Sequence, residues 1–270
     1  MLEYTIADLQ YLMARLRDPE TGCPWDLKQT MRSVLPHTLE EVYELVDAIE
    51  QGDSDQVRQE LGDVLFQVIF YSQLAAEEGD FSFAEVCHDI VAKLLRRHPH
   101  VFPSGQLHSV RDQGAPEELA IKARWEDIKQ QERNQKALHS VLDDVPMALP
   151  ALTRAVKLQK RARQIGFDWA DLAAVVGSLR DEIVELEKAI ASGSEAQVED
   201  EMGDVLFSAI NVARHLGLDP ETVTRGAAQK FERRFRYVEK RCREQGIKGA
   251  KDAADPQLDQ FWSQAKATGL

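Results

Sequence analysis

Acidic residues at a spacing of three occur on two successive segments in the second half of the chain. Glu182 and Glu185 form one pair, and Glu201 and Asp204 form the other. On a helix, residues three apart lie on one face, so each pair would point in one direction. A connection of only a few residues, roughly 191–195, would make the two helices antiparallel neighbours. The spacing therefore predicts four carboxylates that converge across one helix pair.

Four carboxylates at one place suit a divalent cation. Like charges a few ångströms apart repel and raise one another's pKa, so the arrangement is costly without compensation. A single Glu-x-x-Glu pair is most often a solvated acidic face. Here the arrangement occurs twice, because four acids 141 residues earlier repeat it: Glu41, Glu44, Glu60 and Asp63. Since Mg²⁺ takes oxygen ligands and keeps substrate phosphates in its shell, the pattern indicates Mg²⁺ as cofactor, with Mn²⁺ able to substitute.

Basic and aromatic residues further along the chain also repeat, at an offset of 137. Lys230 and Arg234 would share a helix face, and such a pair beside bound Mg²⁺ would complete a polyphosphate site. Trp262 and Lys266 would share another face, where an indole can stack on a nucleobase while the ammonium reaches a phosphate. A solvated basic stripe and a core tryptophan are the plainer alternatives. The counterparts in the first half are Lys93, Arg97, Trp125 and Lys129.

Helices are the elements that must position these residues, because apolar side chains recur at helical spacing nearly throughout. In the first half we expect helices over about 2–16, 38–51, 55–78, 82–98 and 117–133, the second of them starting at a Thr38 capping box. In the second half we expect them over about 150–165, 171–191, 195–216, 220–245 and 256–267. No convincing strand pair or hairpin signal is present.

The repeat also divides the chain into two parts. Small changes of offset between matched blocks are what loop insertions and deletions produce, so two tandem copies of one helical unit explain the similarity. We expect an all-α fold of two tandem helical-bundle domains. The N-terminal domain would span 1–133, a linker 134–149, and the C-terminal domain 150–270.

Composition excludes several kinds of partner. The 33 basic and 46 acidic residues give a net charge of −13, which disfavours duplex nucleic acid and anionic membranes. The longest apolar stretch, residues 64–71, is far shorter than the roughly 20 residues of a membrane span. Three dispersed cysteines without a CxxC motif, and a start that does not resemble a signal peptide, favour the cytoplasm. Neither a Walker A loop nor a GxGxxG motif is present, so metal and side chains must bind any phosphates.

Across nearly its whole length the chain resembles the MazG family of nucleoside triphosphate pyrophosphohydrolases, in the two-copy form. The resemblance rests on the blocks RDPETGCPWDLKQT, TLEEVYEL, ELGDVLFQVIFYSQ, RRHPHVF, the connecting LDDVPMALPALTRAVKLQKRARQIGFDW, EMGDVLFSAINVARHL and KFERRFR. It implies an all-α pyrophosphatase fold, a homodimer, Mg²⁺ dependence and a cytoplasmic location. The implied reaction converts a nucleoside triphosphate, standard or non-standard, and water into a nucleoside monophosphate and pyrophosphate.

The resemblance also assigns roles to the repeated residues. It credits the C-terminal copy with catalysis and makes Glu182, Glu185, Glu201 and Asp204 the Mg²⁺ ligands. Phosphates would bind Lys230 and Arg234, and the nucleotide site would be completed by Trp262 and Lys266. Glu182 and Glu201 are the candidates for orienting the attacking water. The first copy keeps every matching residue, as a second or regulatory site, and its activity is an open question.

Two other functions compete with this interpretation. A carboxylate-bridged di-iron bundle would use Glu-x-x-His pairs, and the i+3 positions here are all Glu or Asp. A regulatory dimer that only binds metal would not need matched acids, Lys/Arg pairs and Trp/Lys pairs twice. The sequence leaves the preferred nucleotide and the physiological role, nucleotide-pool cleaning or stress control, undecided.

Overall fold

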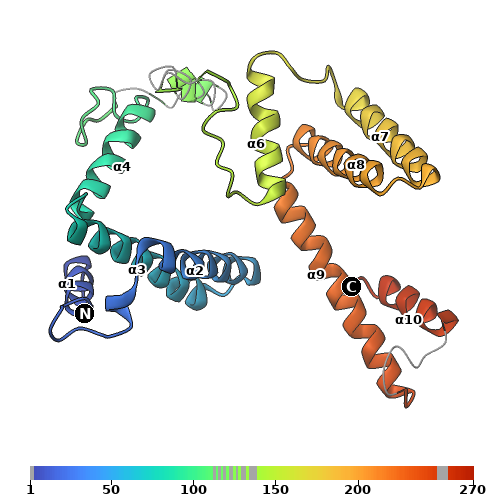
Figure 1. The fold of residues 1–270 in the computed structure, drawn as a ribbon, viewed down its shortest axis with the longest axis horizontal. Coiled ribbons are helices and arrows are strands. Elements are labelled where there is room, and N and C mark those ends of the chain that lie inside the picture. The colour runs from blue at the N-terminus through green and yellow to red at the C-terminus, as the bar shows by residue number, and fades with distance from the viewer. Residues whose placement is uncertain are drawn as a thin grey trace. The chain divides into compact units, whose positions relative to one another are not determined.

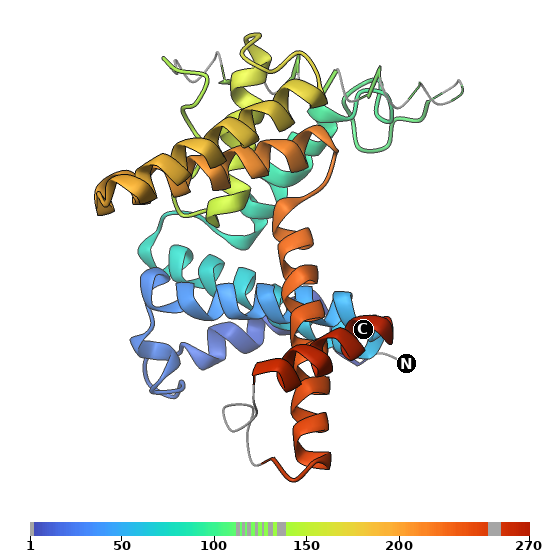
Figure 2. The same cartoon turned by 90° about the vertical axis from the view of Figure 1, so that its right-hand side faces the viewer.

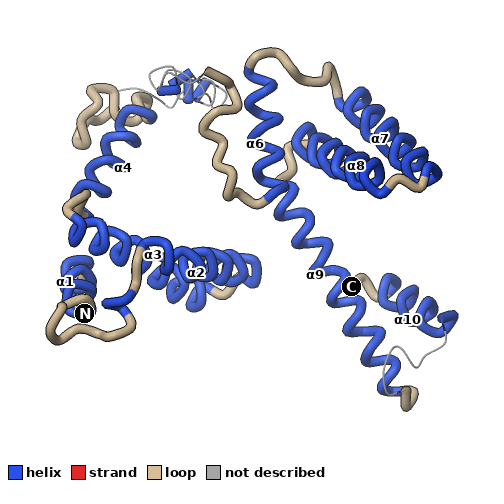
Figure 3. Tube along the Cα trace, viewed as in Figure 1, coloured by secondary structure: helices blue, strands red, loops and turns tan. Residues whose placement is uncertain are grey.

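A computed structural model of the chain describes residues 3–111, 139–247 and 255–270, with 114, 117, 120, 121, 124, 125, 127, 128, 132 and 133 between them. Over these residues the secondary structure is helical, and no strand occurs (Figure 3). The predicted all-α class is therefore confirmed. The chain divides into two compact units, residues 1–131 and residues 132–270, which are treated separately below.

The N-terminal unit contains a short helix followed by a long helical hairpin. Its elements are α1 (Ile6–Leu16), the 3-10 helix η1 (Asp26–Lys28), α2 (Met31–Gln51), α3 (Ser54–Glu78) and α4 (Phe83–Arg97). α2 packs on α3, and α1 and α4 each pack on α3. A capping box starts α4, in which the side chains of Ser82 and Glu85 each accept a hydrogen bond from the other's backbone N–H.

The C-terminal unit repeats the hairpin and adds a second helix pair. Its elements are α6 (Ala151–Gln164), α7 (Leu172–Ser192), α8 (Glu195–His215), α9 (Pro220–Glu244) and α10 (Asp255–Ala267) (Figure 1). α7 and α8 lie side by side, as both ribbon views show (Figure 2). α6 packs on α8 and α9, and α10 packs on α9.

The hairpins α2–α3 and α7–α8 have the same core and the same turn. Both turns pass through a glycine in the left-handed region, Gly52 with a φ of 74° and Gly193 with a φ of 73°. This conformation is costly for residues with a Cβ atom, so glycine is suited to end each first helix. Buried residues also recur at the sequence offset of 141, namely Val34 with Val175, Ala48 with Ala189, and Ile69 with Ile210. The repeat in sequence is thus a repeat in packing.

Two predicted helix starts are wrong. α1 begins at Ile6, after the N-cap Thr5, and not near residue 2. α2 begins at Met31, where Thr30 and Ser33 form the capping box, and not at Thr38. Thr38 instead lies inside the helix, and its hydroxyl donates to the Val34 carbonyl at 3.2 Å. Pro36 is tolerated in the helix interior because its neighbour Val34, 2% exposed, is anchored in the unit's core. Tertiary packing here outweighs the helix-breaking tendency of proline.

The remaining cores differ between the two units. In the N-terminal unit one cluster joins α1, α2 and α3 through Met13, Val34, Ile69, Phe70 and Leu74. In the C-terminal unit a small cluster joins α6 and α8, and a separate one of Val238, Cys242 and Phe261 joins α9 and α10. The helix pair α9–α10 therefore has its own packing. Over the described residues, none of the helices is both long enough and apolar enough to cross a membrane.

Candidate active site

The α7–α8 hairpin brings three of the predicted acids together. The turn at Gly193, followed by the N-cap Ser194, makes the two helices antiparallel neighbours. Carboxylate oxygens of Glu182, Glu201 and Asp204 lie within 4.8 Å of one another. We call these three residues the C-terminal acid cluster. A set of three converging carboxylates is the kind of oxygen-rich donor set that Mg²⁺ prefers.

Electrostatic strain within the cluster supports this fit. Burial raises the pKa of Glu182, and the neighbouring Asp204 and Glu185 raise it further. The pKa of Glu201 is raised by burial and by Glu185, while Lys188 opposes the shift. Glu185 is thus close enough to act on both residues although it is not one of the three converging ligands. A bound cation would relieve the repulsion that causes these shifts.

The N-terminal unit contains an equivalent cluster. Glu41, Glu60 and Asp63 on α2 and α3 also bring carboxylate oxygens within 4.8 Å of one another. Burial raises the pKa of Glu41, with Asp63 and Glu44 adding to the effect. Burial likewise raises the pKa of Glu60, followed by the charge of Glu44. The two units therefore offer the same donor set and the same repulsion.

The predicted phosphate- and base-binding residues form a separate group on α9 and α10. Lys266 lies over the Trp262 ring, with Nζ 6.0 Å from its centroid, and Trp262 packs at 5.4 Å on Phe231. The Nε atom of Arg234 donates to the Leu270 carbonyl at 2.6 Å. Lys230 lies on α9 with Arg234. Within the described residues, no hydrogen bond or ion pair joins these side chains to the C-terminal acid cluster, and their placement beside the acids stays a prediction.

Their counterparts in the N-terminal unit are arranged differently. Lys93 and Arg97 lie on α4. Trp125 packs against two histidine rings, at 5.1 Å from His98 and 6.5 Å from His100. Lys129 lies outside the described residues. The histidine pair has no match in the C-terminal unit, where Trp262 packs on a phenylalanine instead.

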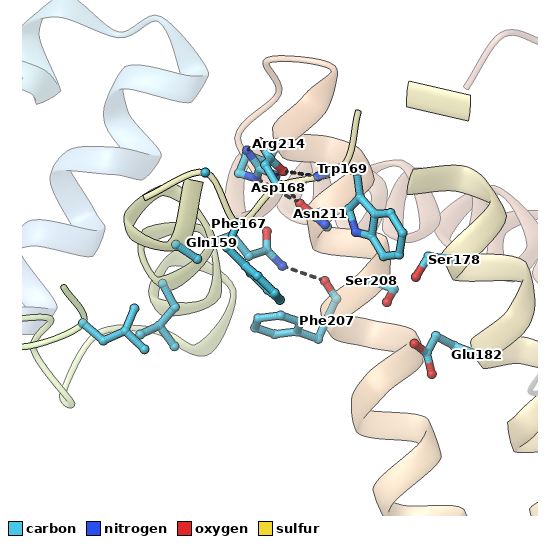
Figure 4. Close-up of a pocket in the computed structure, with 14 residues that line it drawn as sticks. Gln159, Phe167, Asp168, Trp169, Ser178, Glu182, Phe207, Ser208, Asn211 and Arg214 are labelled. Carbon is cyan, nitrogen blue, oxygen red and sulfur yellow. Dashed lines mark hydrogen bonds and ion pairs between the residues drawn. The ribbon is translucent and has the colours of Figure 1, made fainter. Parts of the chain in front are cut away.

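A cavity of about 540 Å³ opens beside the C-terminal acid cluster. It lies among α6, α7, α8 and the loop that connects α6 to α7 (Figure 4). Glu182 belongs to both the cavity wall and the acid cluster. Most of the wall surface is apolar, and half of the lining residues carry a polar or charged side chain. The lining residues are Leu142, Leu158, Gln159, Ala162, Gly166, Phe167, Asp168, Trp169, Ser178, Glu182, Phe207, Ser208, Asn211 and Arg214. We call this space the C-terminal cavity.

Comparison with known proteins identifies the family. A family model described as the MazG nucleotide pyrophosphohydrolase domain matches the chain twice, over residues 29–102 and 172–238. The chain belongs to the MazG family. The two MazG matches cover α2 to α4 and α7 to most of α9, and so contain both acid clusters and the Lys/Arg pairs. They do not include Gln159, the loop 166–169, or Trp262 and Lys266.

Two relatives matched over nearly their full length support the same assignment. A protein of Escherichia coli K12 named nucleoside triphosphate pyrophosphohydrolase is 49% identical over 257 residues, which is 94% of each chain. A Thermotoga maritima protein named nucleoside triphosphate pyrophosphohydrolase/pyrophosphatase MazG is 39% identical, over 96% of this chain and 94% of its own. The uncharacterized protein YabN of Bacillus subtilis is 39% identical over 99% of this chain and 53% of its own length.

One group of residues in this MazG chain was missed by the sequence reasoning. Asp168, in the loop between α6 and α7, is bound by Arg214 through both guanidinium Nη atoms, and His215 Nε2 lies 3.0 Å away. Arg214 is buried, with 4% of its side chain exposed. The guanidinium holds the pKa of Asp168 well below its usual range. The signal in the sequence was that two of the blocks that carry the family resemblance contain these residues, GFDW with Asp168 and EMGDVLFSAINVARHL with Arg214 and His215.

Proposed function

We propose that this chain hydrolyses nucleoside triphosphates to nucleoside monophosphates and pyrophosphate at the C-terminal acid cluster, with Mg²⁺ as cofactor and Mn²⁺ as a substitute. The observation that carries the proposal is the convergence of Glu182, Glu201 and Asp204 within 4.8 Å. The names of the Escherichia coli and Thermotoga maritima relatives, both nucleoside triphosphate pyrophosphohydrolases, support it.

The chemistry follows from the charges of the site. Bound Mg²⁺ would neutralise the triphosphate and polarise the α-phosphorus. Glu182 or Glu201 orients a water molecule and accepts its proton as the oxygen attacks the α-phosphorus, and pyrophosphate leaves. Lys230 and Arg234 are proposed to bind the phosphates, with Trp262 and Lys266 completing the nucleotide site.

The C-terminal copy is the proposed working site because of what surrounds its acids. Glu182 lines a largely apolar cavity that leaves room for a nucleoside. In the N-terminal copy, the space beside the acids is lined by Glu40, Tyr43, Glu44, Asp47, Gln56 and Glu60. At the matched position of the C-terminal copy Lys188 replaces Asp47, so that face is less negative and should repel a triphosphate less. The N-terminal copy is therefore proposed as a second or regulatory metal site.

Assembly and location form part of the proposal. The hairpins carry large apolar side chains that are at least 38% exposed, Val42, Leu61, Leu65 and Val68 on one and Ile183, Val184, Met202 and Leu206 on the other. Exposed apolar surface on this scale marks an interaction face, so we propose a homodimer. Three free cysteines are consistent with a cytoplasmic location. Nucleotide-pool cleaning or stress control is the proposed role, with neither duplex nucleic acid nor a membrane as partner.

Pyrophosphate release from a panel of nucleoside triphosphates, with and without Mg²⁺, tests the proposal. Glu201→Gln removes one charged ligand from the C-terminal acid cluster and should lower turnover at least about 100-fold. Glu60→Gln, the matched change in the N-terminal copy, should leave most of the turnover. Absence of turnover with every triphosphate would refute the proposed activity. Loss through Glu60→Gln alone would exchange the roles of the two copies.

A further inference from the structure

The C-terminal cavity holds polar groups that the proposed hydrolysis does not use. Its wall contains Gln159 from α6, and Ser208 and Asn211 from α8, between aromatic side chains (Figure 4). None of these residues belongs to the acid cluster. A mostly apolar space with a few fixed polar groups is the usual form of a small-molecule site.

We propose that the C-terminal cavity binds the base of the nucleoside triphosphate, with Gln159 Oε1 accepting an N–H of the base and the Asn211 amide donating to a base acceptor. The inference rests on the proposed function, because it names the subsite that receives the substrate's base. The ligand class is a purine or pyrimidine that presents a donor and an acceptor on one edge. Glu182, which lies in both the cavity and the acid cluster, connects this subsite to the phosphate chemistry.

Gln159 provides an acceptor whose orientation is fixed. Only 7% of the residue is exposed, and its Nε2 donates to the Phe207 carbonyl at 3.0 Å. This bond determines which end of the amide carries the oxygen. The Oε1 atom is buried and has no hydrogen-bond partner among the described residues. Because a buried acceptor without a partner is unfavourable, an N–H from a ligand in the cavity would stabilise the site.

Asn211 provides the complementary donor. Its Oδ1 accepts from Arg214 Nε at 2.9 Å and from Arg214 Nη2 at 2.7 Å. An amide whose oxygen is engaged in this way presents its NH₂ group as the remaining hydrogen-bonding function. Gln159 and Asn211 therefore offer one acceptor and one donor to the same cavity, and a nucleobase presents the complementary donor and acceptor on one edge.

Aromatic side chains supply faces on which a base can stack. Phe167 is 80% exposed, Trp169 47% and Phe207 42%, although all three line the cavity. Large aromatic side chains are usually buried, so three exposed ones around one space indicate a ligand surface. Stacking on aromatic rings does not depend strongly on which base is bound, because every base has a π-face. Discrimination between bases would then come from the polar edge contacts.

The N-terminal copy has different side chains at positions that line the cavity. At the offset of 141, Phe70 stands in place of Asn211, Gln67 in place of Ser208, and His37 in place of Ser178. Phe70 is 2% exposed and packs in the core with Met13 and Leu74. The side chain that replaces the donor thus fills the equivalent space. The copies keep the same acids and differ where a base would bind.

Equilibrium binding separates the base subsite from catalysis. The ligands are α,β-methylene nucleoside triphosphates, which cannot be cleaved at the α-phosphorus, and a triphosphate of ribose without a base, each with Mg²⁺. Asn211→Phe copies the N-terminal residue into the cavity and should weaken binding of base-bearing ligands about tenfold or more relative to the abasic one. Phe70→Leu, at the matched position of the N-terminal copy, should leave that ratio unchanged.

A second variant tests the edge contact directly. Gln159→Met keeps the side-chain length and removes the acceptor, so it should weaken UTP-analogue binding about three- to tenfold. The loss should be absent for the N3-methyluridine analogue, which has no N–H at that position. Thermal unfolding of each variant checks that it is folded.

The outcomes distinguish the two proposals. Preferential binding of base-bearing over abasic ligands that disappears in Asn211→Phe supports the subsite, even if no triphosphate is hydrolysed. If wild-type protein hydrolyses triphosphates but Asn211→Phe and Gln159→Met bind base-bearing and abasic ligands in the wild-type ratio, the base subsite is refuted and the hydrolase proposal stands.

Discussion

Glu182 and Asp168 line the same cavity and have opposite electrostatic surroundings. Burial and neighbouring acids raise the pKa of Glu182, whereas the Arg214 guanidinium keeps the pKa of Asp168 low. Environments that shift the pKa values of two carboxyl groups in opposite directions commonly give the two groups different roles. A bound cation, or a proton on Glu182, would relieve the repulsion between Glu182 and the neighbouring acids. Asp168 stays ionised and serves as an anchor.

The raised pKa of Glu182 gives a prediction for the metal-free protein. A carboxyl whose pKa is higher in the folded state than in the unfolded state favours folding at pH values below the unfolded pKa, and that benefit is lost as pH rises through the folded pKa. At pH 7 without metal, Glu182→Gln should therefore raise the unfolding temperature. It should also reduce the further rise that Mg²⁺ produces in the wild type.

Thermal unfolding in EDTA and in Mg²⁺, at pH 7 and pH 5, measures both effects. The gap between Glu182→Gln and wild type in EDTA should narrow at pH 5, because protonation of Glu182 relieves the same repulsion. Glu187→Gln, an exposed acid on α7 outside the cluster, is the control. A Glu182→Gln protein that is less stable than wild type in EDTA would contradict the metal-site interpretation.

At the scale of elements, the loop between α6 and α7 is held to α8 by one ion pair. Arg214 is 4% exposed and Asp168 16% exposed, so breaking the pair leaves a nearly buried cation. Asp168→Asn should cost about 2–3 kcal/mol of unfolding free energy, below the loss for a fully buried pair. Urea unfolding at pH 7 measures this loss.

The pH dependence of that loss has a definite sign. The pKa of Asp168 is lower in the folded state than in the unfolded state. The ionised carboxylate therefore adds its full contribution to the free energy of unfolding above the unfolded pKa of about 3.9, and this contribution is lost as the pH falls through the folded pKa. The difference between Asp168→Asn and wild type should thus persist at pH 5. Arg163→Gln removes a 70% exposed partner of the same carboxylate and should cost less than about 1 kcal/mol. Equal losses for both variants would argue against the Arg214 anchor.

The sequence predicted the helices and the acid clusters because both depend on local spacing. Glu182 with Glu185, and Glu201 with Asp204, share helix faces, and the short turn at Gly193 pairs those helices. The start of α2 was misjudged because Thr38 also fits the spacing of a capping box, whereas the helix begins at the capping box of Thr30 and Ser33 and buries Val34.

Contacts between distant segments were beyond reach of the sequence. Gln159 gives no signal of its burial or of its unpartnered oxygen, since both depend on how α6 packs on α8. The Asp168–Arg214 pair joins residues 46 positions apart. That Lys230 lies near the acids was predicted from the repeat alone. A repeat in sequence does not determine how α9 packs against α7 and α8, so this placement stays a proposal.

For the molecule as a whole, the exposed apolar residues on the hairpins predict self-association. A chain of 30.5 kDa should elute as a dimer of twice that mass in size-exclusion chromatography with light scattering. Leu206, 55% exposed on α8, is one of the residues we expect at the interface. Leu206→Asp should weaken the dimer at least about tenfold, because a buried unpaired charge is unfavourable.

A control on a loop tests the specificity of that effect. Leu107 is also 55% exposed but lies outside the hairpins, so Leu107→Asp should leave the dimer intact. A wild-type protein that remains monomeric at micromolar concentration would contradict the homodimer proposal.

Arg214 is bonded to both Asp168 and Asn211, and therefore takes part in the fold of the loop and in the polar wall of the cavity. A lineage that altered nucleotide preference by replacing Asn211 would disturb the anchor that keeps the loop in place. Changes of preference at this position should then require compensating substitutions elsewhere in α6 or α8. If the base subsite lies only in the C-terminal copy, the N-terminal copy, in which Phe70 packs in the core, should be the freer of the two to diverge at the matched positions.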